Sequence, residues 1–255
     1  MITQYRFSIQ SLDNQSVSSE RAYAIYSWLL TKIPASYGDM LHQQGEKPIS
    51  QYIYYNNHHA QADKTNQIIW TVSCLNQEIS DVLEPVLKNL DIIPLHSGNL
   101  KATCLEHISI SSVGELHDLA ERDLNSRYLH LSFHSPTAFK HDGQYIIFPE
   151  KRLLLRSLAE KWDYAFPAYP IRDEETLNAI ENGVKITDYR LQSCRFALKN
   201  IRVPGFSGQI ILQSNLAPPL MKLWNSFIYF ASFSGIGMKT TLGMGGVKAS
   251  MRIEK

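Results

Sequence analysis

The alternation of apolar and polar residues in the first hundred positions switches between the periods of strands and helices. The run "YRFSIQ" at residues 5–10 alternates with a period of two, which predicts a strand. Apolar residues then recur at helical spacing until Pro34, and two strand-like runs follow in "ISQYIYY" and "QIIWTVSCL". A second helix is predicted over residues 77–90, and "DIIPLHSG" indicates a short closing strand. The order β-α-β-β-α-β is that of a ferredoxin-like unit, the arrangement of RRM domains.

The second half repeats this order with longer elements. "YLHLSFHSP" alternates as a strand, "FPEKRLLLRSLAEKW" carries a helical apolar stripe, and a short helix over residues 173–182 ends at Gly183. Two strand-like runs, "VKITDYRLQSCRFALKN" and "GQIILQS", flank a predicted turn at "VPGFSG". A helix in "LAPPLMKLWNSFIYFASF" and a strand in "VKASMRI" complete the pattern. We predict an α+β fold of two tandem ferredoxin-like (RRM-like) halves, an N-terminal domain over residues 1–97 and a C-terminal domain over residues 105–255.

The composition narrows the class of protein without identifying a partner. Apolar residues make up 44% of the 255 positions and charged residues 19%, and the net charge of +1 leaves only a local basic face for a polyanion. The three cysteines are far apart and form no C-x-x-C pair, which disfavours a zinc site or disulfides and is typical of a reducing cytosol. The start lacks the apolar block of a signal peptide, and the longest apolar region is too short to span a bilayer. We therefore expect a cytoplasmic protein without a metal or cofactor.

Five of the 13 glycines lie within the stretch "GIGMKTTLGMGG", between the last predicted helix and the last predicted strand. A Walker loop and a Rossmann fingerprint both need a strand before the loop and a helix after it, so neither matches. Missing β-carbons permit positive φ angles and let a large ligand lie against the backbone, and Lys239, Thr240 and Thr241 offer a charge and hydroxyls for phosphate oxygens. The alternative is a helix C-cap at Gly235 followed by a glycine-rich turn.

The spacing Gly235-Ile-Gly237, five residues, Gly243-Met-Gly245 resembles a known family signature. It is similar to the C-terminal glycine-rich motif of the CRISPR-associated endoribonucleases that process repeat RNA (the Cas-six family). In that family the motif lies just before the last strand of the second ferredoxin-like half, as it does here. "LHQQGEKPIS" is similar to the family's histidine-bearing segment after the first helix, and "YLHLSFHSPTAFK" with "FPE" to the segment that opens its second half. The resemblance spans nearly the whole chain.

The resemblance implies metal-independent cleavage of CRISPR repeat RNA. In such a reaction the 2′-hydroxyl attacks the adjacent phosphorus and leaves a 2′,3′-cyclic phosphate and a 5′-hydroxyl. The family pattern points to His42 as acid or base, to Lys47 as the cation at the transition state and to Tyr26 as a third participant, with Tyr37 as a competing choice. It also implies that RNA contacts the glycine loop, at Gly235, Gly237, Lys239, Thr240, Gly243 and Gly245.

Further polar residues leave alternatives open. Arg190, Arg195 and Lys199 could supply a basic ribbon for the RNA backbone, or belong to a solvated hairpin face. His130 and His134 share one strand face and could bind a metal or RNA, but we expect outward polar residues because no carboxylate completes a metal site. The expected partner is repeat RNA, with an effector complex and a second copy of the chain as further candidates. The rival functions are a non-catalytic crRNA-binding subunit of a CRISPR effector complex, a small-molecule enzyme whose glycine loop holds a nucleotide phosphate, and a purely structural protein.

Overall fold

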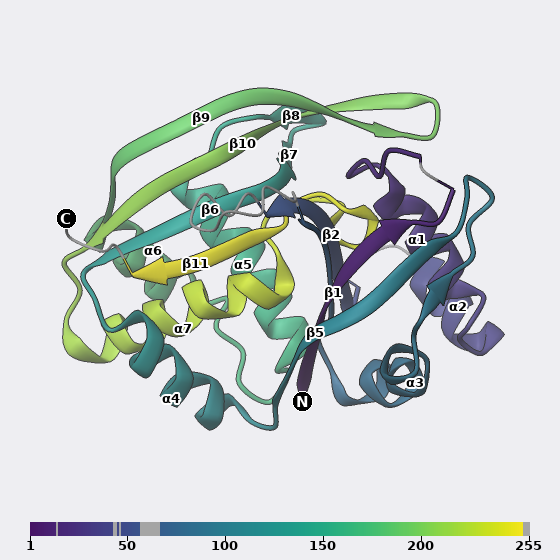
Figure 1. The fold of residues 1–255 in the computed structure, drawn as a ribbon. Helices are drawn as coiled ribbons and strands as arrows, with labels where there is room; N and C mark the ends of the chain where they lie inside the picture. The colour runs from purple at the N-terminus through teal and green to yellow at the C-terminus, as the bar shows by residue number, and fades with distance from the viewer. Residues whose placement is uncertain (14, 43–44, 46, 57–66, 252–255) are drawn as a thin grey trace, which may run out of the picture.

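The computed structural model of the 255-residue chain describes residues 1–13, 15–42, 45, 47–56 and 67–251. Within these residues the chain forms two large antiparallel sheets, each covered by helices on one side, and a small two-stranded ribbon (Figure 1). No helix in these ranges combines the length and the apolar character that a bilayer crossing needs. The predicted α+β fold is confirmed.

The first half builds a sheet whose described strands run in the order β2-β3-β1-β5-β4. Helices α1 and α3 share one core with this sheet, around the buried side chains of Phe7, Leu29 and Trp70. Helix α3 begins at a side-chain cap, because the Asn76 carboxamide oxygen accepts from the Ile79 N–H at 3.0 Å. The elements are β1 (Ile2–Ser11), α1 (Arg21–Leu30), α2 (Ala35–His42), β2 (Ile49–Asn56), β3 (Gln67–Cys74), α3 (Gln77–Lys88), β4 (Ile92–Ile93) and β5 (Leu100–Ile110).

The fourth strand of the first ferredoxin-like unit is β5 and not the segment that the sequence indicated. The predicted closing strand forms only the short β4, which pairs with the outer edge of β5, while β5 itself pairs with β1 along its whole length. Strand β5 therefore crosses the boundary predicted between residues 97 and 105. We propose that the division between the two halves follows Ile110, where the first sheet ends and α4 (Val113–Leu124) begins three residues later.

The second half has the strand order β11-β6-β10-β9, which is the ferredoxin-like order for four strands numbered along the chain. Its core is rich in aromatic rings from α5 and α7, among them Trp162, Phe227 and Phe230, which meet edge to face. The remaining elements are β6 (Tyr128–Thr137), β7 (Phe139–His141), β8 (Gln144–Ile146), α5 (Lys151–Ala165), α6 (Glu174–Gly183), β9 (Val184–Leu198), β10 (Ile201–Ser214), α7 (Pro218–Ser234), the 3-10 turn η1 (Thr240–Leu242) and β11 (Val247–Met251).

The long hairpin of β9 and β10 turns at Lys199–Asn200, so the turn predicted at "VPGFSG" was wrong. Those six residues lie inside β10, and Leu198 is paired with Ile201. Gly205 and Gly208 are in the strand because neighbouring backbone lies where their β-carbons would be: the Thr137 carbonyl oxygen 2.8 Å away and the Arg190 carbonyl oxygen 2.1 Å away. The hairpin consequently extends from the second half towards α1 of the first (Figure 1).

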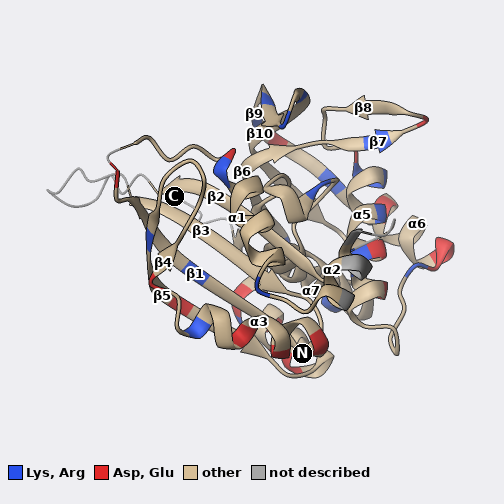
Figure 2. Cartoon of the chain, turned by 90° about the vertical axis from the view of Figure 1, so that its right-hand side faces the viewer, with Lys and Arg blue, Asp and Glu red and all other residues tan. Residues whose placement is uncertain are grey.

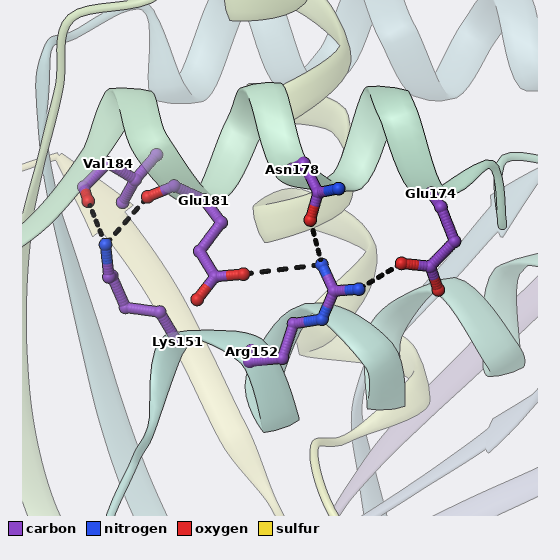
Figure 3. A network of polar contacts seen from close by, with 6 residues as sticks. All are labelled: Lys151, Arg152, Glu174, Asn178, Glu181 and Val184. Atoms are coloured by element: carbon purple, nitrogen blue, oxygen red, sulfur yellow. Dashed lines mark hydrogen bonds and ion pairs between the residues drawn. The ribbon is translucent and has the colours of Figure 1, made fainter.

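A polar network ties the base of this hairpin to the helices beneath it (Figure 3). The Arg152 guanidinium on α5 donates to Asn178 at 2.8 Å and pairs with Glu174 and Glu181, all on α6. The neighbouring ammonium of Lys151 donates to the carbonyl oxygens of Glu181 and Val184, at 2.7 and 3.0 Å. Because Val184 is the first residue of β9, the network fixes where the hairpin leaves the core.

Candidate functional site

A pocket of about 590 Å³ lies where the two halves meet. The first half lines it with α1 and with residues on either side of the end of α2. The second half lines it with the turn of the β9–β10 hairpin and with the glycine loop, which we define as residues 235–246. The residues concerned are Tyr23, Tyr26, Ser27, Leu30, Leu41, Lys47, Leu198, Lys199, Asn200, Ile201, Thr241 and Leu242. Residues from distant parts of the sequence thus share one cavity, of a size typical of ligand sites.

Two of the three predicted catalytic side chains line this pocket. Lys47 is half-buried there, and Tyr26 is 7% exposed, with burial raising the pKa of its phenol. His42 is the last residue of α2, next to the pocket-lining Leu41, but its side chain lies outside the described residues. Tyr37, the competing choice, does not line the pocket, because its hydroxyl donates to the Glu78 carboxylate of α3 at 2.6 Å.

The glycines of the loop make room for protein atoms. A β-carbon on Gly237 would lie 2.4 Å from the Ala138 carbonyl oxygen, and one on Gly243 would lie 2.5 Å from the Ala22 β-carbon. Gly235 has the positive φ of the C-cap of α7, as the alternative interpretation predicted. The backbone segments that contain Gly235 and Gly245 also pack directly against each other. The open backbone face that we expected for a ligand is therefore filled by the protein, since all four glycines are buried. RNA contact at Gly235, Gly237, Gly243 and Gly245 stays a prediction.

Buried polar side chains hold the loop in place, and no sequence pattern predicted them. On α5, the Ser157 hydroxyl accepts from the Gly237 N–H at 2.8 Å, and the buried Lys161 ammonium donates to the Gly237 carbonyl oxygen at 2.8 Å. On β2, the Gln51 amide donates to the carbonyl oxygens of Ala22 and Thr241, at 2.6 and 2.9 Å. Such satisfied buried groups fix geometry more firmly than apolar contacts do. The loop is thus joined to both halves.

The polar residues of the loop differ in their positions. Thr241 lines the pocket, whereas the buried Thr240 points its methyl group at Gly235 and Gly245. Lys239 is half-buried with a left-handed backbone and does not line the pocket. Among the loop's hydroxyl-bearing residues, Thr241 is therefore better placed than Thr240 to meet a ligand there.

The two arginines of the predicted ribbon lie on opposite faces of β9. Arg190 is paired with Gln209 and Arg195 with Pro204 in an unbroken stretch of the ladder, and side chains an odd number of residues apart point to opposite sides of a sheet. Both are exposed, and neither lines the pocket. Figure 2 shows basic residues on the hairpin at the top of the view and acidic residues around α3 at the bottom. The hairpin is a basic element, but these two arginines form no single ribbon.

A second pocket, of about 440 Å³, lies between β1, β2 and β5 of the first half and α7 and β11 of the second, with Arg6 and Lys248 in its lining. Nearby, the His134 ring packs against Tyr54 with 4.5 Å between ring centroids. Burial, together with Lys248 and Arg6, lowers the pKa of His134 to about 4, so it is neutral at pH 7. His130 pairs with Gln209 at 3.0 Å, and no group of three metal-ligating side chains occurs in the described part of the chain.

Comparison with known proteins gives one consistent result. Residues 131–247 match the family model described as CRISPR-associated endoribonuclease Cas6. The CRISPR-associated endoribonuclease Cas6 of Streptococcus thermophilus is 28% identical over 248 residues, which cover 96% of this chain and 97% of the relative. That of Mycobacterium tuberculosis (strain CDC 1551 / Oshkosh) is 26% identical over 235 residues, 88% of this chain and 70% of the relative.

Among solved structures, a Cas6 product complex superimposes with a TM-score of 0.74 at 21% identity, covering 98% of this chain and all of the other. At that identity the superposition shows that the fold is shared. The family match, the two relatives and the tandem ferredoxin-like architecture agree with the spacing of the glycine loop. In sequence over nearly its whole length and in its fold, the chain is similar to the Cas6 family of CRISPR-associated endoribonucleases.

Proposed function

We propose that this chain cleaves CRISPR repeat RNA (pre-crRNA) in the 590 Å³ pocket between its halves and so produces mature crRNA. The reaction is attack of the substrate's own 2′-hydroxyl on the adjacent phosphorus, without a metal ion, to give 2′,3′-cyclic phosphate and 5′-hydroxyl ends. One observation carries the proposal: Tyr26 and Lys47 of the first half line a single pocket with Thr241 of the glycine loop. The names of the relatives support an endoribonuclease of this class.

Each proposed residue has a role that its chemistry suits. Because burial raises the pKa of Tyr26, its phenol keeps its proton at neutral pH and can donate a hydrogen bond to a phosphorane oxygen. Lys47 supplies a positive charge to the same dianionic transition state. His42 follows the pocket-lining Leu41 in the sequence, and we assign it the role of acid or base, since imidazole exchanges protons near neutral pH.

RNA reaches the pocket over basic surface from the second half. We propose that the exposed Arg190 and Arg195 bind phosphates on the two faces of the hairpin, and that Lys239 binds the backbone beside the glycine loop. Gly235, Gly237, Gly243 and Gly245, with Thr240, act by shaping the loop that presents Thr241 to the RNA. We also propose that the chain passes its product to an effector complex, which size-exclusion chromatography of the RNA-bound chain mixed with effector subunits measures. We propose as well that two copies of the chain can form a dimer, which the same method measures with and without RNA.

The test uses cognate repeat RNA in EDTA with wild type, His42→Ala and a matched control, His141→Ala, which removes an exposed histidine at the end of β7. General acid–base catalysis contributes about 10²–10⁴-fold, so His42→Ala should lose at least about a hundredfold in cleavage rate while its Kd for RNA stays within about twofold. His141→Ala should match wild type in both. Chemical analysis of the ends should find the cyclic phosphate.

Three outcomes decide between the candidates. Unchanged cleavage by His42→Ala removes this residue from the mechanism. Loss of cleavage in EDTA that returns with Mg²⁺ contradicts the metal-independent reaction. Tight binding of repeat RNA by a wild-type protein that never cuts it favours the non-catalytic subunit of an effector complex.

A further inference from the structure

The turn of the β9–β10 hairpin is built from a residue that its backbone geometry disfavours. Leu198 and Ile201 are paired, so Lys199 and Asn200 form a two-residue loop, and Lys199 has a φ of +53°. Two-residue hairpin turns strongly prefer glycine, asparagine or aspartate at positions of positive φ, because glycine has no β-carbon to clash there and the short polar side chains hydrogen-bond locally. Strained residues of this kind concentrate at functional sites, where the fold over-determines them.

The turn brings the Lys199 side chain to the first half of the molecule. Its ammonium lies 5.4 Å from the centroid of the Tyr23 ring on α1, a cation–π contact between the halves. A hydrogen bond to Lys199 is also the main reason that the pKa of the Tyr23 phenol is lowered. Both residues line the pocket together with Lys47, and Lys199 itself is exposed. The contact therefore positions a solvated charge at the pocket and buries very little.

We propose that Lys199 binds a phosphate of the RNA backbone next to the scissile phosphate, and that Tyr23 positions the Lys199 ammonium for this contact. The ligand is a phosphodiester of single-stranded RNA. An ammonium has three N–H donors, so it can keep the Tyr23 contact and still donate to phosphate oxygens. The strained turn then has a reason, since it places a cation of the second half in the same pocket as Lys47 of the first.

This inference rests on the proposed cleavage of repeat RNA in the same pocket, but it also predicts how substitution of Lys199 changes the stability of the fold. A purely structural tie between the halves would make Lys199 important for stability. If Lys199 binds a phosphate, it is needed for RNA binding, and its replacement by glycine should stabilise the fold because glycine suits the turn. The two roles therefore predict opposite changes in the melting temperature.

The experiment compares Lys199→Gly with wild type on cognate repeat RNA. We expect the melting temperature to stay equal or rise, kcat/KM for cleavage to fall at least tenfold at moderate salt, and the slope of log Kd against log salt to shrink by about 0.7, one phosphate contact on a single strand. Asp142→Gly is the matched control, because Asp142 also has a positive φ, +48°, in the β7–β8 turn. It should raise stability without changing RNA binding.

Variants of Tyr23 separate positioning from direct contact. Tyr23→Phe keeps the ring and its cation–π contact and should retain most of the affinity, whereas Tyr23→Leu should reproduce much of the Lys199→Gly defect, including the smaller salt slope. If Lys199→Gly has a lower melting temperature than wild type, the RNA assays are repeated with Lys199→Asn, because asparagine also adopts the left-handed backbone and carries no charge.

The result that overturns the inference is wild-type kcat/KM and salt slope in a folded Lys199→Gly or Lys199→Asn. If wild type cleaves the repeat, His42→Ala does not and Lys199→Gly does so normally, only this inference fails. If wild type does not cleave repeat RNA at all, the proposed function fails, and the salt slope still reports whether Lys199 binds phosphate.

Discussion

Substitution of Gly243 by alanine isolates what the glycine loop contributes to the joint between the halves. Gly243 has a φ of +108°, and an added β-carbon would lie 2.5 Å from the β-carbon of Ala22 on α1 and 3.2 Å from Phe196 on β9. Neither neighbour can yield easily, because both are buried and belong to different halves. The alanine would therefore push α1 and the loop apart at the pocket that Thr241 and Leu242 line.

The expected cost has two parts. A left-handed backbone costs an L-residue roughly 1–2 kcal/mol. Overpacking a buried contact adds about 1–3 kcal/mol. Together these lower the free energy of unfolding by about 2–5 kcal/mol, less the roughly 0.4–1 kcal/mol that alanine gains by restricting the unfolded chain. Gly143→Ala is the matched control: its φ is +78°, but nothing lies within 4 Å of the added β-carbon, so it has the strain without the clash.

Urea denaturation measures both variants, and the difference between them gives the cost of the clash. Adding Ala22→Gly to Gly243→Ala removes the 2.5 Å contact, so the double-mutant cycle should show a favourable coupling of about 1 kcal/mol or more. Cleavage should fall in Gly243→Ala and not in Gly143→Ala. Equal stability of Gly243→Ala and Gly143→Ala, or no coupling to Ala22, would show that Gly243 does not pack closely against Ala22 of α1.

Three further predictions follow from single residues. Tyr26→Phe removes a donor from the pocket, so the cleavage rate should fall by roughly a hundredfold with little change in melting temperature, measured in single-turnover assays. The unfolded chain protonates His134 near pH 6.5 and the folded chain only near pH 4, so the free energy of unfolding should drop by up to about 3 kcal/mol as the pH falls through that window; a His134→Gln variant should lack this drop in urea titrations. Arg152→Ala breaks partly exposed ion pairs and should cost only about 1 kcal/mol, an effect that shrinks in high salt.

The elements that sequence predicted well are those whose burial follows a clean period. Strand β6 alternates between buried and half-buried residues over its whole length, and α3 has a single apolar stripe. Strand β5 escaped prediction because most of its side chains are exposed and its alternation is interrupted at Leu105, where the pairing with β1 shifts register. The turn of the long hairpin was misplaced because Gly205 and Gly208 are typical of turns, and only the approach of neighbouring backbone explains them inside a strand.

Prediction of the site from the sequence was limited in the same way. Glycine spacing located the loop and the family, but composition cannot say whether a ligand or the protein itself fills the space beside a glycine. Lys47 and Tyr26 were found through the family pattern, and both line the pocket. Lys199 was predicted only as part of a basic ribbon and Gln51 was missed, because their places beside the pocket depend on where a turn and a strand lie in space. Nothing in their neighbouring residues carries that information.

The most direct test of the account is a crystal structure with a repeat RNA whose scissile 2′-hydroxyl is replaced by hydrogen. We predict that the scissile phosphate lies in the 590 Å³ pocket, within hydrogen-bonding or ion-pairing reach of Lys47 and Tyr26. A scissile phosphate held elsewhere, for instance beside Arg6 and Lys248 in the second pocket, would contradict the account.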